Sequence, residues 1–252
     1  MTSIVGVLCE DGVVIGADSS VTFGDPRTGM TIEQPFQKLE LVWGKVILAS
    51  TGQIGLGQRF NAVINKQWNN VFRESPVEID KAFSRTMIED MLFTHINANN
   101  GLYGAIVAFP ASNKLHLCEF ALADFQPELK SDRLWYCSMG SAQRITDPFL
   151  AFMRNVFWQD GRPTLHGGIF AVTWTLQHAI ETNTGGVNGP IQIAVLEPER
   201  KNPTNPTQAR ILSAEELEEH KQNIDEAKKA LRDFQKQQQP TAASNIPPIP
   251  KP

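Results

Sequence analysis

The chain begins with two apolar, β-branched runs separated by a short polar stretch. The runs cover residues 4–8 and 13–17, and Glu10-Asp11-Gly12 lies between them. An Asp followed by a Gly, which readily takes a positive φ, is typical of a tight hairpin turn. The pattern therefore predicts a β-hairpin whose first strand starts at the second residue.

A strand that starts this early holds the chain terminus in a sheet, and a held terminus can carry out chemistry. If Met1 is removed, Thr2 offers a hydroxyl and a free α-amine on one residue. An α-amine has a pKa of about 7.7–8.0, so a useful fraction is neutral near pH 7 and can accept the hydroxyl proton. With the turn centred near Asp11, we expect Thr2 to lie opposite Ser20, with Asp18 as a diagonal neighbour on the same face. The alternative is a buried hairpin in which these side chains satisfy backbone groups.

The rest of the chain shows both strand-like and helix-like periodicity. We expect a loop at 21–37, strands at 37–42, 45–50, 102–110, 114–121, 133–138 and 191–196, and helices at 52–72, 77–98, 142–158 and 167–183. Several of the strands are apolar on both faces, which argues for sheets covered on each side. Two such sheets packed together, with helix pairs outside, predict an α+β fold, a four-layer α-β-β-α sandwich.

The composition changes after the last of these strands. The chain divides into four expected segments: a catalytic body at 1–196, a linker at 197–212, a polar helix at 213–239 and a Pro-rich tail at 240–252. The helix starts with a capping box, Ser213-Ala214-Glu215-Glu216, and has an apolar stripe of Leu217, Ile224 and Leu231. Because the linker separates this helix from the body, we expect truncation after Pro206 to leave the body folded.

The composition is that of an ordinary globular domain and excludes some partners. The 252 residues are 41% hydrophobic and 20% charged. A net charge of −4 gives no electrostatic footprint for nucleic acid or for an anionic membrane, so we expect neither as a partner. No run approaches the ~20 apolar residues of a membrane span, and no secretory signal precedes the hairpin, so we expect a cytoplasmic protein.

The three cysteines and the glycine-rich stretches do not indicate a metal or cofactor site. Cys9, Cys118 and Cys137 lie in apolar, strand-like segments without Cys-x-x-Cys spacing, which predicts reduced core residues. The glycines of 52–57 are in the wrong order for a dinucleotide fingerprint, and there is no P-loop. We therefore expect no metal and no cofactor.

Several motifs, taken together, resemble one protein family. They are Thr2-Ser3-Ile4-Val5-Gly6, Gly12-Val13-Val14-Ile15-Gly16-Ala17-Asp18, Lys38, Gly44-Lys45-Val46-Ile47 and Gly52. In position, spacing and strand context they resemble the β-type subunits of proteasomes over residues 2–196. They are also similar to the peptidase subunit of the bacterial two-component heat-shock protease, and most of all to the shorter bacterial proteasome-like homologues. The resemblance implies the fold of N-terminal nucleophile hydrolases.

The resemblance also implies roles for single residues. Thr2 would be the nucleophile and its α-amine the general base. Lys38 would lie near Thr2 and lower the pKa of this amine, while Asp18 would pair with Lys38 and orient it. Ser141 belongs to a Gly140-Ser141 pair that matches the family, and it would hydrogen-bond the terminal amine.

The same alignment also assigns an oxyanion donor and the residues of the substrate side-chain pocket. Ala49 stands where the family has a Gly whose backbone N–H stabilises the oxyanion, and a backbone donor is retained with Ala. Before the last strand the family often has an Asp and a second Ser; Asn183 and Thr184 are the nearest polar residues here, and neither is given a role. The alignment predicts a mainly apolar side-chain pocket formed by Val21, Ile47 and Thr51, with Phe36 and Glu40 at its edge.

The implied function is that of a threonine-type endopeptidase subunit. The family implies a homo-oligomer of stacked rings around an internal chamber, with peptides or unfolded proteins as substrates and an ATP-dependent unfoldase as a candidate partner. Only Met1 precedes Thr2, so we expect methionine removal, and no self-cleavage, to expose the amine. Two alternatives stay open: an N-terminal-nucleophile amidohydrolase that acts on a small amide, and an inactive ring scaffold or partner-binding protein that uses the C-terminal helix.

Overall fold

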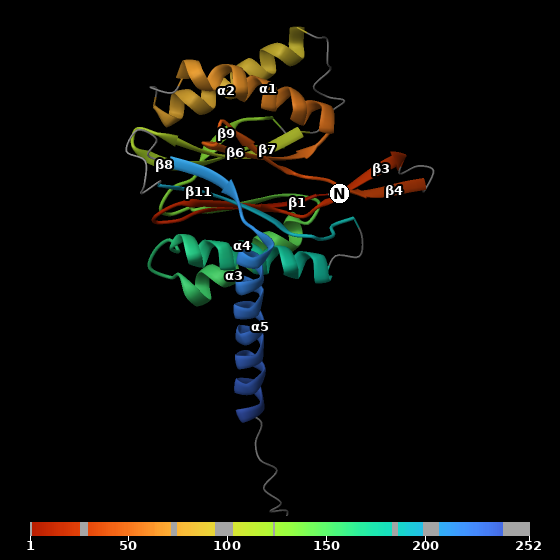
Figure 1. Cartoon of the computed structure of the whole chain (residues 1–252), viewed down its shortest axis with the longest axis vertical. Helices are drawn as coiled ribbons and strands as arrows, with labels where there is room; N and C mark the ends of the chain where they lie inside the picture. The colour runs from red at the N-terminus through yellow and green to blue at the C-terminus, as the bar shows by residue number, and fades with distance from the viewer. Residues whose placement is uncertain are drawn as a thin grey trace, which may run out of the picture.

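Two helix pairs enclose two β-sheets, so the body has four layers (Figure 1). Helices α1 (Ile54–Val71) and α2 (Pro76–Phe93) cover one side, and α3 (Gln143–Phe157) and α4 (Leu165–Thr182) cover the other. The computed structural model describes residues 2–25, 30–71, 75–93, 103–122, 124–182, 186–198 and 207–238. The predicted four-layer α+β sandwich is confirmed.

The first sheet holds the beginning of the chain. Its order is β10-β1-β2-β11-β12, and its antiparallel strands are β1 (Ser3–Leu8), β2 (Val13–Ala17), β10 (Tyr136–Gly140), β11 (Gln192–Pro198) and β12 (Thr207–Ile211). Strand β1 lies between β2 and β10, so backbone hydrogen bonds hold it on both edges. The residue that precedes β1 is therefore fixed relative to the sheet.

The predicted hairpin is confirmed, but its register differs by one residue from the prediction. Ile4 pairs with Ala17, and the N–H of Asp18 donates to the carbonyl of Ser3 at 3.1 Å. The turn is closed by Cys9 N–H donating to the Gly12 carbonyl at 2.8 Å, which moves its centre half a residue from Asp11. Asp18 thus lies opposite Ser3, and the predicted pairing of Thr2 with Ser20 is wrong.

The second sheet lies under α1 and α2 (Figure 1). Its order is β5-β6-β7-β8-β9, with β5 (Leu39–Val42), β6 (Val46–Gly52), β7 (Tyr103–Ala111), β8 (Lys114–Phe120) and β9 (Pro127–Leu129). Trp43 and Gly44 turn the chain between β5 and β6 with φ values of 54° and 61°. Strand β6 lies between β5 and β7, packs on strands of the first sheet and leads into α1.

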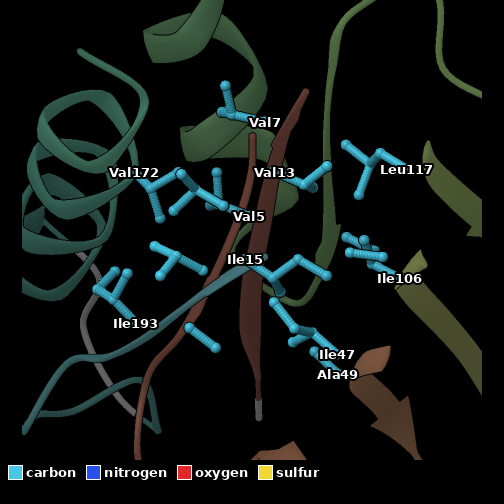
Figure 2. Packing of buried hydrophobic residues seen from close by; sticks show 14 of the residues in the cluster. Val5, Val7, Val13, Ile15, Ile47, Ala49, Ile106, Leu117, Val172 and Ile193 are labelled. Carbon is cyan, nitrogen blue, oxygen red and sulfur yellow. The ribbon is translucent and has the colours of Figure 1, made fainter. Parts of the chain in front are cut away.

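A continuous apolar core joins the two sheets to each other and to α4 (Figure 2). In the close-up, Ile15 points from β2 toward Ile47 and Ala49 of the second sheet, while Val5 points the other way, toward Val172 of α4. All five side chains are fully buried. The strands are apolar on both faces because one face packs on a sheet and the other on a helix.

Two stretches that the sequence predicts as irregular contain strands. Residues of the predicted loop at 21–37 form an antiparallel pair, β3 (Ser20–Asp25) and β4 (Met30–Pro35), which projects from the body beside the start of the chain (Figure 1). The predicted linker at 197–212 contains the end of β11 and all of β12, which extends the first sheet. The loop and linker predictions are wrong at these positions. Residues 94–98 of the second predicted helix, residues 199–206 of the linker and the tail at 240–252 lie outside the described residues.

The C-terminal helix α5 (Ala214–Gln237) begins with the predicted capping box, in which Ser213 and Glu216 hydrogen-bond each other's backbone N–H groups. Its first half packs on α4 and its second half extends beyond the body (Figure 1). Leu217 and Ile224 of the apolar stripe are buried, whereas Leu231 is 55% exposed. The helix therefore belongs to the body over its first three turns.

Truncation after Pro206 is now expected to destabilise the body, which reverses the expectation from the sequence. The cut removes β12 and the buried side chains of Leu212, Leu217 and Ile224. Each buried aliphatic side chain contributes about 1.5–3 kcal/mol, so the loss is roughly 5 kcal/mol or more. Thermal unfolding followed by circular dichroism checks this, with a chain that ends at Gln238 as the reference. An unchanged melting temperature after the Pro206 cut would contradict the assignment of β12 and α5 to the body.

The cysteines are free and buried, as predicted, and burial raises the pKa of each thiol above its usual value. They are therefore protonated core residues near neutral pH. None of the helices in the described ranges combines the length and the hydropathy of a membrane span.

Candidate active site

Thr2 lies where β1 begins, next to the end of β10. Its N–H donates to Ser141 Oγ at 3.1 Å, and the Ser141 hydroxyl donates to the Thr2 carbonyl oxygen at 3.3 Å. Gly140 has a φ of 105°, and a Cβ there would come within 2.2 Å of the same carbonyl oxygen. Only glycine allows this approach. The Gly140-Ser141 pair therefore fixes the Thr2 backbone and brings a hydroxyl to its nitrogen.

Asp18 follows β2 and is completely buried. One carboxylate oxygen accepts the N–H of Ser3 at 2.8 Å, and the other accepts the N–H of Ser20 at 3.0 Å. The first oxygen also lies 2.6 Å from the ammonium of Lys38. Two backbone donors and a cation thus replace the water that burial removes from this carboxylate.

Lys38 connects Asp18 to Thr2. Its Nζ lies 2.6 Å from Asp18 Oδ1 and 3.5 Å from Thr2 Oγ1, and the residue is only 6% exposed. Burial lowers the pKa of Lys38 below its usual value, and the Asp18 carboxylate opposes this effect. The arrangement places a buried positive charge beside the Thr2 hydroxyl, where it favours a negatively charged oxygen.

A cavity opens beside Thr2 between β5, β6, the start of α1 and the β3–β4 hairpin. The described residues that line it are Thr2, Val21, Phe36, Lys38, Glu40, Ser50, Gly52, Gln53, Ile54, Gly57 and Gln58. A hydroxyl, a buried cation and a cavity that admits a side chain therefore meet at one point. This combination is suited to nucleophilic attack on a bound carbonyl.

Comparison with known proteins decides the family. The family model for proteasome subunits matches residues 1–150 of this chain. The chain belongs to the proteasome subunit family. Comparison with curated proteins finds no match.

Two solved structures show the same fold as this proteasome-family chain. A Gly-1 mutant of Anbu from Hyphomicrobium sp. strain MC1 aligns with a TM-score of 0.68 and 16% identity, over 92% of this chain and 97% of its own. Anbu from Yersinia bercovieri, described as an ancestral beta-subunit, aligns with a TM-score of 0.67 and 12% identity, over 92% and 96% of the two chains. The fold of this proteasome subunit is that of the proteasome-type N-terminal nucleophile hydrolases.

Three residues that the alignment placed in the site of this proteasome subunit lie elsewhere. Ala49 and Ile47 have no exposed surface and belong to the core between the sheets, and Thr51, on the same face of β6, is also buried. None of the three lines the cavity. Successive side chains of a strand point to opposite faces. The three residues are all odd-numbered and therefore share the face of β6 that does not line the cavity. The cavity is formed instead by Ser50 and Gly52 from the other face.

The position of Gly52 also changes the expected oxyanion donor. Ala49 is paired with Leu39 on one side and with Ile106 on the other, so its backbone is enclosed in the sheet. Gly52 ends β6 beyond the last residue that pairs with β5, has a φ of 103° and lines the cavity with Thr2. A glycine two residues before a helix is the sequence signal that indicates this strand end.

Gln192 is a further residue of the site that the sequence did not reveal. Its side-chain oxygen accepts the N–H of Lys38 at 3.0 Å, and its side-chain nitrogen donates to the Phe36 carbonyl at 2.8 Å. These bonds fasten the segment that carries Lys38 to the first residue of β11. A polar residue at the start of an apolar strand is only a weak signal. Asn183 and Thr184 lie outside the described residues.

Proposed function

We propose that this proteasome subunit is a threonine-type endopeptidase that attacks peptide bonds with the Thr2 hydroxyl after removal of Met1. The observation that carries the proposal is the position of the Lys38 ammonium, 2.6 Å from Asp18 and 3.5 Å from Thr2 Oγ1. The buried charge disfavours a proton on the nearby α-amine and so keeps that amine available as a base. The same charge favours the alkoxide that forms when the hydroxyl loses its proton.

The reaction follows from these groups. The α-amine takes the proton of the Thr2 hydroxyl while Oγ1 forms a bond to the substrate carbonyl carbon, and the backbone N–H of Gly52 stabilises the resulting oxyanion. The proton then passes to the leaving amine, and the C–N bond breaks to give an ester. Water attacks the ester, assisted by the same amine, and releases the acid product and the threonine. Ser141, which accepts the N–H of Thr2, would keep the amine oriented through these steps.

We further propose that the subunits form stacked rings with the Thr2 residues inside, because subunits of this family typically form rings. A chamber would admit peptides and unfolded chains and exclude folded proteins from an unselective nucleophile. Folded substrates would then need an ATP-dependent unfoldase.

The test uses the purified, processed protein. An electrophile that reacts with a hydroxyl and an α-amine on the same residue should add once per chain by intact mass, and should stop hydrolysis of fluorogenic peptides. Electron microscopy of the same sample should show rings. Hydrolysis of small amides without any hydrolysis of peptides would favour the amidohydrolase alternative. Rings with neither adduct nor hydrolysis would favour the inactive scaffold.

Removal of the Lys38 charge is expected to lower kcat/KM for peptides by about a thousandfold or more, because the base and the alkoxide both lose their stabilising charge. Lys38→Ala also leaves the Asp18 carboxylate buried and unpaired, which costs about 3–5 kcal/mol of stability. Lys38→Met keeps most of the buried aliphatic side chain and should lose the same activity, and both variants are assayed at a temperature at which circular dichroism shows them to be folded. Lys114→Ala, at the exposed start of β8, is the matched control. A loss below about tenfold, or ~1.4 kcal/mol, would remove Lys38 from the catalytic site.

A further inference from the structure

One acidic residue in the cavity has no part in the proposed reaction. Among the described residues that line the cavity, the charged ones are Lys38 and Glu40. The ammonium of Lys38 lies against Asp18 and Thr2, at the catalytic end. Glu40 therefore contributes negative charge to the part of the cavity that is left for substrate.

The position of Glu40 suits a substrate side chain. Glu40 lies in β5 two residues after Lys38, a separation of about 7 Å in extended chain, and both residues line the cavity. This spacing is comparable to the reach of an extended lysine side chain that starts at a carbonyl bound near Thr2. Asn61 of α1 donates its side-chain amide to Glu40 Oε2 and so orients the carboxylate.

The other walls of the cavity match a long side chain with a polar end. Val21, Phe36 and Ile54 offer apolar surface, against which a methylene chain can pack. Gln53 and Gln58 supply further polar groups. Glu40 itself is half-buried, and burial raises its pKa above the usual value. The charged form of a carboxylate in this setting is stabilised by a nearby cation, which replaces the water that burial removes.

We propose that this cavity binds the side chain that precedes the scissile bond, and that Glu40 gives it a preference for lysine and arginine. The proposal rests on the proposed peptidase function and names its substrate class. It also revises the mainly apolar pocket expected from the sequence, because a neutral apolar side chain would cover Glu40 without compensating its charge. An acidic side chain would be repelled.

The experiment separates binding from catalysis. Thr2→Ala protein is titrated with two N-acetylated tetrapeptide amides that end in lysine or in its uncharged analogue norleucine, and affinities are measured by ligand-observed NMR. We expect the lysine peptide to bind at least about tenfold more tightly, and Glu40→Gln in the same background to bring the two affinities within about threefold. Glu10→Gln, an exposed site in the β1–β2 turn, changes the net charge equally and should keep the preference. Equal affinities before the Glu40 change, a preference that survives Glu40→Gln, or no binding of either peptide would overturn the proposal.

Hydrolysis distinguishes failure of this proposal from failure of the peptidase function. The processed wild-type protein is assayed with matched fluorogenic peptides that carry lysine, norleucine or glutamate before the reporter. Two results together support the peptidase function and the role of Glu40. The kcat/KM is highest for the lysine peptide, and Glu40→Gln lowers it about tenfold for that substrate only. Hydrolysis without a preference for lysine overturns the role of Glu40 and leaves the peptidase function intact. A Glu40-dependent lysine preference in binding, with no hydrolysis of any peptide, supports the pocket assignment and overturns the peptidase function.

Discussion

Replacing Thr2 by alanine is expected to abolish both peptide hydrolysis and reaction with the hydroxyl-and-amine-directed electrophile. The substitution removes the only group that the proposed mechanism uses to form the covalent bond. The backbone N–H and carbonyl of residue 2 bond to Ser141, and alanine keeps both bonds, so it should take the same position. A single-turnover assay measures hydrolysis, intact mass measures the adduct with the electrophile, and the melting temperature measures stability. The melting temperature should stay within a few degrees of the wild type.

The neighbouring residue supplies a matched control for the loss of a hydroxyl. Ser3 is completely buried, and its Oγ has no hydrogen-bond partner within the described part of the chain. Ser3→Ala therefore removes an unsatisfied polar atom and should leave hydrolysis and labelling unchanged. Thr2→Ser keeps the nucleophilic oxygen and should retain measurable activity. Hydrolysis at the wild-type rate by Thr2→Ala would show that another group attacks the substrate.

The layers of the fold follow from the sequence because burial on both faces leaves a clear pattern in the strands. Segments such as 4–8 and 105–108 contain no polar residue, and two packed sheets with helices outside cover such strands on both faces. The β3–β4 hairpin gives no such pattern. Gly24, Asp25 and Pro35 are unusual in strands, and the hairpin projects from the body as two strands that pair with each other.

The proposed catalytic residues and the residues that line the cavity differ in how well the sequence predicts their positions. The structure brings Thr2, Asp18, Lys38 and Ser141 together as the motif spacing predicts, because each lies at the end of a strand or directly beside one. The wall of the cavity depends on which face of β6 is inward, and a shift of one residue exchanges the faces. The alignment therefore misplaced Ile47 and Ala49, which belong to the core, and Thr51, which is buried and does not line the cavity. Gln192 hydrogen-bonds the backbone of Phe36 and Lys38, which are far from it in the chain, and no local sequence pattern indicates such a contact.

The second large effect is expected from Met1 itself. While Met1 is attached, the nitrogen of Thr2 is an amide, whose lone pair is delocalised into the carbonyl and cannot accept the hydroxyl proton. The Thr2 N–H donates to Ser141 Oγ at 3.1 Å, so this nitrogen already lies at the position that the proposed mechanism requires and lacks only its basicity. Protein that retains Met1 should therefore have no measurable peptide hydrolysis and should form no adduct with the electrophile.

The measurement compares a single preparation with Met1 retained and with Met1 removed. The protein is produced with methionine aminopeptidase inhibited, retention of Met1 is confirmed by intact mass, and activity is assayed before and after treatment with the purified aminopeptidase. Removal of Met1 should restore hydrolysis in proportion to the fraction of processed chains, because each processed chain gains one free α-amine. Thr2→Ala protein treated in the same way should stay inactive, which ties the gain to the hydroxyl as well as to the amine. Full activity while Met1 is retained would place the base on another residue, and the N-terminal-nucleophile mechanism would then be wrong for this chain.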